Sequence, residues 1–188
     1  MQEGIGAQGV DTILHAYGGG VHVRLVYNEP DFFPNPSPVR PPPATRPEVL
    51  QALKVPMRFI PGIPDLMHHK YVVRDATDVW SGSTNWTDDS WSRQENVIVR
   101  VLGSPALARG FTLNLDELWE RGNVEHTGRV QPRPVALGPG IEARAWFTPE
   151  YGDALSHRVA KFLGRARKRI RIASPVLTSG PILATLVE

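Results

Sequence analysis

The residues best suited to chemistry lie close together, between positions 66 and 85. His68 and Lys70 are two positions apart, and a β-strand directs every second side chain to the same face. On a strand, an imidazole and an ammonium group would therefore face one space. The polar loop 82–85 follows a little later in the chain. The sequence predicts that one strand and one loop together form a site for an anion.

A strand, a turn and a second strand must position these groups. Residues 71–73 are tyrosine and two valines, which favour strands, and the polar stretch 75–78 is typical of the turn that ends one. A second short strand at 79–81 would then bring the loop 82–85 beside His68 and Lys70. This hairpin is the local structure on which the site depends.

Helices and strands alternate around the hairpin, which indicates an α/β fold. Ser104 and Pro105 are suited to the N-cap and first position of a helix that ends near Arg121. Its apolar residues recur at helical spacing. The inward-facing residues are predicted to be Leu107, Phe111, Leu115, Leu118 and Trp119. Other predicted elements are helices at 8–17 and 48–54 and strands at 21–27, 57–60 and 97–99.

The order of elements divides the chain into three parts. Residues 1–122 form one repeat that carries the site but lacks its first elements, and its segment 29–47 is a proline-rich loop. Residues 123–140 are rich in glycine and proline and are predicted to be a linker. Residues 141–188 then restart the order, with a strand at 141–147, a helix at 151–168 and a strand at 170–173.

Composition restricts the function without deciding it. The chain has 21 basic and 19 acidic residues, so its net charge of +2 would not by itself draw it to nucleic acid or to an anionic membrane. It has no cysteine, which excludes disulfides and thiol nucleophiles. Neither a signal peptide nor an apolar run of about 18 residues is present. The localisation stays unknown: either the protein is cytoplasmic or its true N-terminus is missing.

Six residues at fixed spacing connect the site to a known family. They reproduce a His-x-Lys-x4-Asp-x6-Gly-Ser-x-Asn signature, and the chain on this ground resembles the phospholipase D superfamily, including cardiolipin synthase-like proteins. The segment Glu95-Asn96, followed by the strand 97–99, resembles the acidic residue and strand that follow the signature in that family. The signature residues are His68, Lys70, Asp75, Gly82, Ser83 and Asn85.

The resemblance implies a mixed β-sheet flanked by helices, and a covalent mechanism at His68. A neutral imidazole attacks phosphorus without adding negative charge, and a phosphohistidine divides one difficult displacement into two easier ones. His68 would be this nucleophile, or the general acid if a second copy of the motif attacks. Lys70 would bind the phosphoryl oxygens, and Glu95 would accept the other ring N–H of His68 and fix its tautomer.

The remaining signature residues take supporting roles in this interpretation. Ser83 and Asn85 would donate hydrogen bonds to the phosphate. Asp75 lies an odd number of residues from His68, so it would face away from the phosphate and hold the turn, and Gly82 is likewise assigned a structural role. Neither a cofactor nor a metal is expected, because His68 and His69 would point to opposite faces and no cluster of carboxylates accompanies them.

The family's active site uses two copies of the motif, and this chain carries one. The second could come from a missing downstream half or from a homodimer mate. Alternatively, the late strand, helix and strand could fold back to complete the first repeat as a permuted single domain without activity. The expected function is a phosphodiester hydrolase or phosphatidyl transferase that acts on a phospholipid. The alternatives are a nuclease of the same superfamily and a non-catalytic phosphate-binding or scaffold fragment.

Overall fold

The computed structural model describes residues 5–28, 54–61 and 65–187. The predicted loop 29–47 and the predicted helix 48–54, apart from its last residue, lie outside these ranges. The described elements of the first part are α1 (Ile5–Gly18), β1 (Leu25–Asn28), β2 (Met57–Ile60), β3 (Tyr71–Arg74), β4 (Asp78–Gly82), α3 (Asp88–Ser92), β5 (Ile98–Val101) and α4 (Pro105–Arg121). The later elements are β6 (Val135–Gly138), β7 (Ile141–Ala143), α5 (Gly152–Leu163) and α6 (Gly180–Val187).

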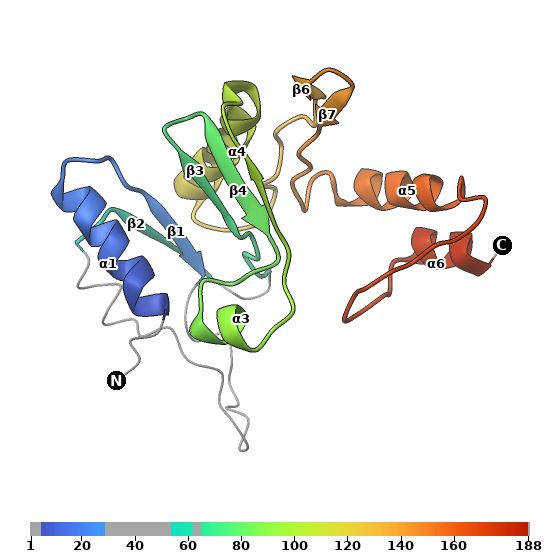
Figure 1. Cartoon of the computed structure of the whole chain (residues 1–188), viewed down its shortest axis with the longest axis horizontal. Helices are drawn as coiled ribbons and strands as arrows, with labels where there is room; N and C mark the ends of the chain where they lie inside the picture. Colours follow the sequence, from blue (N-terminus) through green and yellow to red (C-terminus); the bar gives the residue numbers. More distant parts are fainter. Residues whose placement is uncertain (1–4, 29–53, 62–64, 188) are drawn as a thin grey trace, which may run out of the picture.

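The fold is α/β, as predicted, with parallel and antiparallel pairing. Strands β1 and β2 are parallel, whereas β3, β4 and β5 form an antiparallel sheet with β4 in the middle. Strands β6 and β7 form a separate antiparallel hairpin. Within the described residues the strands form three small sheets, which together show the mixed parallel and antiparallel pairing that we predicted. Figure 1 shows α1 beside β1 and β2, and α4 against the sheet that carries the site.

Helix α4 supports the three-stranded sheet. Its bounds match the prediction, and Leu107, Phe111 and Leu118 are buried, although Leu115 and Trp119 are only half-buried. The Ser104 hydroxyl does not cap the helix. Instead, the Ser104 amide donates to the Thr77 carbonyl at 2.8 Å, which ties the start of the helix to the hairpin turn.

The main core lies between α4 and β3–β4. Val79, Leu107 and Phe111 are buried there together with Phe147, which comes from far along the chain. The Tyr71 ring packs edge-on against the rings of Phe111 and Phe147, with centroids 5.1 and 6.5 Å away. Because aromatic pairs of this kind contribute beyond the area they bury, the cluster holds the late segment on the early sheet.

The later part of the chain departs from the prediction in two places. Strand β6 lies within the stretch 123–140 that we predicted to be a linker, and Val130 and Val135 pack against the main core. Residues 170–173 form no strand, so that prediction is wrong. A strand requires a hydrogen-bonding neighbour, and the described residues offer none to this stretch.

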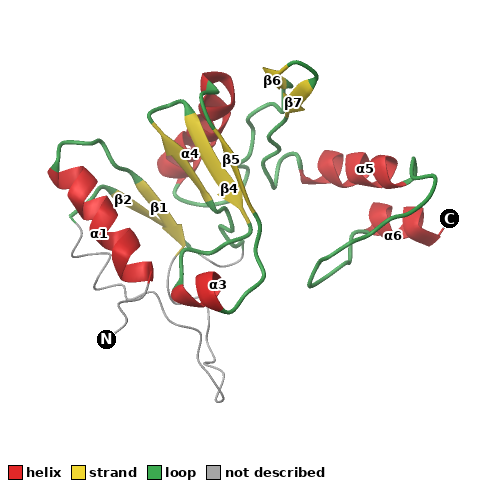
Figure 2. Cartoon of the chain, viewed as in Figure 1, coloured by secondary structure: helices red, strands yellow, loops and turns green. Residues whose placement is uncertain are grey.

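The predicted strand 141–147 and helix 151–168 are both shorter in the structure, because β7 ends at Ala143 and α5 at Leu163. Helices α5 and α6 pack on each other to one side of the sheets, where Figure 2 shows them joined by a long loop. The Ser156 and Ser179 hydroxyl oxygens are 2.5 Å apart at the contact between them. None of the side chains described in α6 is buried.

Candidate active site

His68 and Lys70 lie immediately before β3 rather than within it. The backbone pairing nevertheless reaches Lys70, whose carbonyl accepts from the Gly82 amide at 3.2 Å. The ammonium group of Lys70 donates to the His68 carbonyl at 2.7 Å. His68, Lys70 and Gly82 all line one cavity of about 320 Å³. The prediction that the histidine and the lysine share one space is confirmed, although no regular strand carries them.

The end of β1 fixes the segment that leads to His68. The Asn28 side-chain oxygen accepts a hydrogen bond from the Met67 amide at 3.2 Å. Met67 directly precedes His68, so this bond restrains the backbone beside the imidazole. Asn28 is a positioning residue that sequence reasoning did not identify, because 39 positions separate the two partners.

Partial burial makes both His68 and Lys70 weaker bases than they are in water. It lowers the pKa of His68 below its usual value, and the nearby Lys70 charge lowers that pKa further. Burial also lowers the pKa of Lys70 to about 8. At neutral pH the imidazole is therefore mainly uncharged and the ammonium mainly charged. A neutral nucleophile beside a cation is the combination that attack on a phosphodiester requires.

His69 also lines this cavity, and its ring packs against two aromatic side chains. Its ring lies 5.7 Å from the Tyr71 ring and 6.0 Å from the Phe147 ring, measured between centroids. Burial is the main cause that lowers its pKa, with Lys70 and His68 as smaller causes. The prediction of a packed histidine agrees with this placement.

Gly82 is required by the close approach of the chain before β5. A Cβ atom at this position would lie 2.1 Å from the Val97 carbonyl oxygen, so no larger residue fits without movement of the backbone. The next residue, Ser83, donates its amide to the same carbonyl at 3.0 Å. The structural role predicted for Gly82 thus has a steric reason.

The Ser83 hydroxyl is already hydrogen-bonded to other groups of the protein. It donates to the Asn96 side-chain oxygen at 2.8 Å and accepts from the Val97 amide at 3.1 Å. Donation to a phosphate would require the bond to Asn96 to break. Asn96 in turn donates to the Ser90 carbonyl at 3.0 Å, so it links the loop after β4 to α3.

Two other predicted residues lie outside the cavity lining. Asn85 and Glu95 are exposed, and neither makes a side-chain hydrogen bond or ion pair with the described part of the chain. In particular, Glu95 does not contact the His68 ring in the arrangement that we expected from the resemblance. Both roles stay predictions, and both would require movement when a substrate or a second motif is bound.

Asp75 lies in the β3–β4 turn, as predicted, but it is not the main hydrogen-bonding group there. It is exposed, has a φ of 51° and lies 3.6 Å from the Arg74 guanidinium. The buried Asp78 instead accepts bonds from the Gly103 amide at 3.0 Å and from the side chains of Thr77 and Arg74.

One wall of the cavity comes from residues 144–147, which sequence reasoning did not assign to the site. The buried Phe147 ring anchors this segment against Phe111 at 5.1 Å. Arg144 lines the cavity, and its buried Nε has no hydrogen-bond partner among the described residues. Trp146 lies beside it. No local signal could have predicted this wall, because it depends on how the segment folds back.

The loop at residues 128–129 connects that wall to α4. The Glu117 carboxylate of α4 accepts hydrogen bonds from the Gly128 amide at 3.0 Å and from the Arg129 amide at 3.1 Å. A Cβ atom on Gly128 would lie 2.9 Å from the Phe147 carbonyl oxygen, so the loop and the wall are in direct contact. Residues 128–147 are thereby held against the half that carries His68.

The described residues contain no group of three or more histidine, aspartate or glutamate side chains that could hold a metal ion. No described helix combines the length and the hydropathy that a membrane span requires.

Comparisons with known proteins agree with the signature. The family model described as "Cardiolipin synthase, PLD-like domain" matches residues 6–119, which is more than half of the chain and includes the whole His68–Asn85 signature. The chain belongs to this phospholipase D-like family. No curated protein sequence matches the chain. Among solved structures, the chain is similar to Nuc from Salmonella typhimurium, described as a phospholipase D family member, with 21% identity over 60% of this chain and 69% of that one and a TM-score of 0.49.

Membership of the phospholipase D-like family supports phosphodiester chemistry as the coarse class of activity. The matched range ends within α4, so the wall at 144–147 lies beyond it.

Proposed function

We propose that this chain supplies a catalytic half-site for phosphodiester hydrolysis or phosphatidyl transfer through a phosphohistidine on His68. The observation that carries the proposal is the cavity in which an exposed, mainly neutral His68 lies beside Lys70. None of the cavity's lining residues is acidic. An anionic phosphodiester would therefore meet cations and a neutral nucleophile without repulsion from a carboxylate.

In the first step a ring nitrogen of His68 attacks phosphorus and forms a P–N bond, while the bond from phosphorus to the leaving alkoxide breaks. Lys70 neutralises the phosphoryl oxygens, and a second histidine gives its proton to the leaving oxygen. In the second step that histidine takes a proton from water or an alcohol, whose oxygen displaces His68 from phosphorus. Water yields a phosphomonoester, and an alcohol yields a new diester.

The second histidine is supplied either by a second copy of this chain or by a further motif in the same protein. A two-fold dimer would bring two identical motifs together. We propose a phospholipid as substrate, since the family model is that of a lipid-processing domain; a nucleic acid is tested as the alternative.

Covalent trapping tests the mechanism. The chain is incubated with a phosphodiester that carries a labelled phosphorus, quenched in alkali, and digested to locate acid-labile label. We expect label on His68, no label in His68→Ala, and unchanged labelling in His157→Ala, whose histidine is exposed on α5. Label that persists in His68→Ala, or activity that survives this substitution, would refute the phosphohistidine.

Substrate assays with and without a chelator distinguish a phospholipid substrate from a nucleic-acid substrate. Mixed micelles of phosphatidylcholine should release choline, and single-stranded DNA should remain intact. Cleavage of DNA alone would identify a nuclease. If the wild-type chain turns over neither substrate and never becomes labelled, even at concentrations that allow dimers, it is a non-catalytic phosphate-binding fragment.

A further inference from the structure

The side chain of Asn96 joins three segments of the chain beside the cavity. Its Oδ1 accepts a hydrogen bond from the Ser83 hydroxyl at 2.8 Å. Its Nδ2 donates to the Ser90 carbonyl at 3.0 Å and to the Gln94 carbonyl at 3.3 Å. Both hydrogens of the amide and its oxygen are therefore used. One side chain thus connects the loop 82–85 to α3 and to the stretch that follows α3.

The two carbonyl groups determine the orientation of this amide. A reversed Asn96 side chain would direct its oxygen at the carbonyl oxygens of Ser90 and Gln94, which can only accept hydrogen bonds. In the bonded orientation Oδ1 faces Ser83, and because Oδ1 cannot donate, the Ser83 hydroxyl must be the donor. A serine hydroxyl has one hydrogen. The hydrogen that a phosphate would require is therefore committed to Asn96.

Ser83 is also held by its backbone neighbours. Its hydroxyl oxygen accepts from the Val97 amide at 3.1 Å, and its own amide donates to the Val97 carbonyl at 3.0 Å. The next residue, Thr84, is only 4% exposed. Gly82 lines the cavity, whereas Ser83 is not among the described residues that do so. Ser83 therefore belongs to a hydrogen-bonded junction next to the cavity.

Through Gly82 this junction reaches the proposed phosphate site. The Gly82 amide donates to the Lys70 carbonyl at 3.2 Å, and the Lys70 ammonium group donates to the His68 carbonyl at 2.7 Å. A shift of the loop 82–85 would therefore move the backbone of Lys70. The distance between the Lys70 charge and a bound anion determines the strength of their attraction, so the anion site depends on a fixed loop.

From these contacts we propose that Asn96 is a positioning residue for the cavity. Asn96 holds Ser83, and this junction keeps Gly82 against the segment of His68 and Lys70. The phosphate is bound by Lys70 without a hydrogen bond from the Ser83 hydroxyl. The inference rests on the proposed function, because it concerns the phosphate that His68 attacks.

Phosphate binding by single and double variants tests this role. Titration calorimetry of the full chain with inorganic phosphate at pH 7 compares wild type, Ser83→Ala, Asn96→Ala and the double variant. Because both substitutions remove the same hydrogen bond, each should weaken binding by about three- to tenfold, the range for one neutral hydrogen bond. The double variant should bind no more weakly than either single variant.

Three results would overturn the proposal. If Ser83→Ala weakens phosphate binding and Asn96→Ala does not, Ser83 is a direct phosphate ligand. If the losses of the two single variants add in the double variant, the two side chains act independently. If neither alanine variant changes the affinity, Asn96 does not position the phosphate site.

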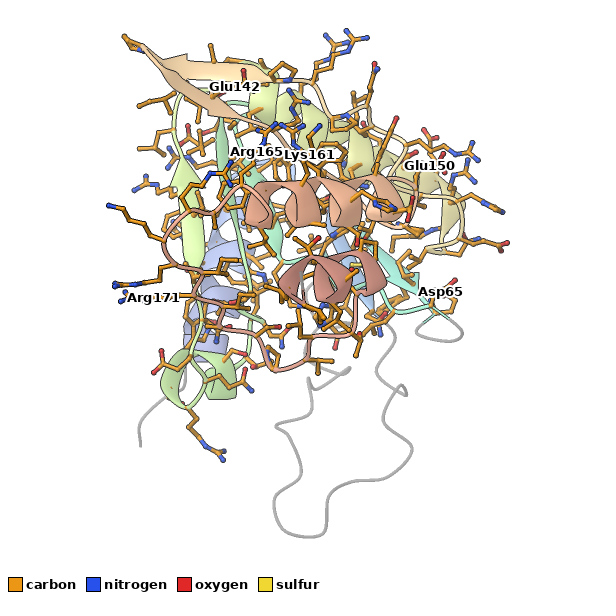
Figure 3. The ribbon with its side chains drawn as sticks, turned by 90° about the vertical axis from the view of Figure 1, so that its right-hand side faces the viewer. Asp65, Glu142, Glu150, Lys161, Arg165 and Arg171 are labelled. Atoms are coloured by element: carbon orange, nitrogen blue, oxygen red, sulfur yellow. The ribbon has the colours of Figure 1, made fainter. Side chains whose placement is uncertain are left out.

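Phosphate bound elsewhere must be separated from phosphate in the cavity. Figure 3 shows Lys161 on α5, and Arg165 and Arg171 on the loop that follows this helix. All three are exposed and can attract phosphate. Lys70→Met should abolish binding in the cavity and leave binding at these exposed cations, so the difference from wild type is the signal to compare.

Matched substitutions control for the loss of an amide and for folding. Asn123→Ala removes an exposed asparagine that follows α4, and it should bind phosphate as wild type does. Ser83→Thr keeps the hydroxyl and should retain the affinity that Ser83→Ala loses. Thermal melting of each variant verifies that it is folded at the temperature of the titration.

NMR spectra of the chain without phosphate separate this inference from the proposed function. The His68 ring and Lys70 amide resonances should shift in the same way in Ser83→Ala and in Asn96→Ala, and should stay in place in Asn123→Ala. If wild type binds no phosphate in the cavity, the proposed function fails at its phosphate site, whereas shared shifts still support positioning by Asn96. If these resonances do not shift, the positioning role is refuted even where phosphate binds.

Discussion

At the scale of single residues, the same burial that weakens the fold prepares His68 and Lys70 for chemistry. Withdrawal from water disfavours both charged forms, and it lowers the pKa of His68 and the pKa of Lys70. The protein loses some stability because Lys70 is charged at neutral pH. The imidazole gains an available lone pair beside a cation. These two consequences can be measured separately.

Removal of the Lys70 charge should raise the pKa of His68. Burial, the larger cause of the shift, remains in Lys70→Met, so the pKa should rise without regaining the usual value of 6.5. NMR titration of the His68 ring protons measures this change. Lys161→Met removes an exposed lysine from α5 and should leave the pKa of His68 as it is in wild type. A His68 pKa that falls or stays constant in Lys70→Met would contradict the coupling.

The stability of Lys70→Met relative to wild type should depend on pH. Because the pKa of Lys70 is about 8 when folded and 10.5 when unfolded, the unfolded chain binds more protons between these values. The partly buried charge of Lys70 therefore lowers the stability of wild type by its full amount below pH 8, and this loss of stability disappears as the pH approaches 10.5.

We expect Lys70→Met to be more stable than wild type at pH 7 and the difference to narrow from pH 8 to 10.5. Urea unfolding at a series of pH values measures this difference in the free energy of unfolding. Lys161→Met, which has the same net charge as Lys70→Met, is the control. A difference that stays constant over this range would show that the Lys70 charge carries no folding penalty.

At the scale of elements, the site depends on how closely β4 and the chain before β5 approach each other. Gly82 allows the contact with the Val97 carbonyl, and Ser83 then bonds to Val97 and Asn96. The Gly82 amide also binds the Lys70 carbonyl. One glycine thus connects the segment of His68 to the loop that follows the motif.

Gly82→Ala should destabilise this junction. The added methyl group must displace backbone rather than a flexible side chain, and overpacking of this kind costs about 1–3 kcal/mol. Gly110→Ala is the control, since Gly110 lies inside α4 with its nearest atom 4.0 Å from the added methyl. That change should stabilise the protein by about 0.5–1 kcal/mol through the unfolded state. Urea melts give both free energies; equal effects from the two substitutions would refute the steric role of Gly82.

At the scale of the whole molecule, the middle of the chain and its C-terminal part differ in how many side chains they bury. Helix α4 buries five side chains, including Leu107, Phe111 and Leu118, whereas α6 buries none that are described. Val176 and Val187 are 67% and 88% exposed. Apolar surface of this kind is a candidate contact for a second copy of the chain or for other parts of the protein.

Hydrogen exchange should therefore distinguish α4 from α6. At low protein concentration we expect the amides of α6 to exchange faster than those of α4, because fewer buried contacts oppose local opening. Mass spectrometry of peptides from both helices measures the rates. If the protection of α6 increases with protein concentration, a second copy covers this helix. Protection of α6 equal to that of α4 at every concentration would contradict the prediction.

Local patterns in the sequence were sufficient for the elements near the motif. Helical spacing and the proline after Ser104 predicted α4 with its start at Pro105 and its end near Arg121, and the run 71–73 with the turn 75–78 predicted the β3–β4 hairpin. The spacing of His68, Lys70 and Gly82 predicted that they meet. Each of these features depends on neighbours within one element or one hairpin, where spacing in sequence determines position in space.

Only the tertiary structure decided what surrounds His68 and Lys70. Phe147 packs against Phe111 and thereby brings Arg144 into the lining of the cavity, and the Ser83 hydroxyl donates to Asn96. The stretch 170–173 has the alternation of a strand but pairs with no strand in the described part of the chain. The sequence by itself determined the motif and the residue types that it brings together, because these are local. The cavity's second wall was decided by packing between segments far apart in the chain, for which local periodicity carries no signal.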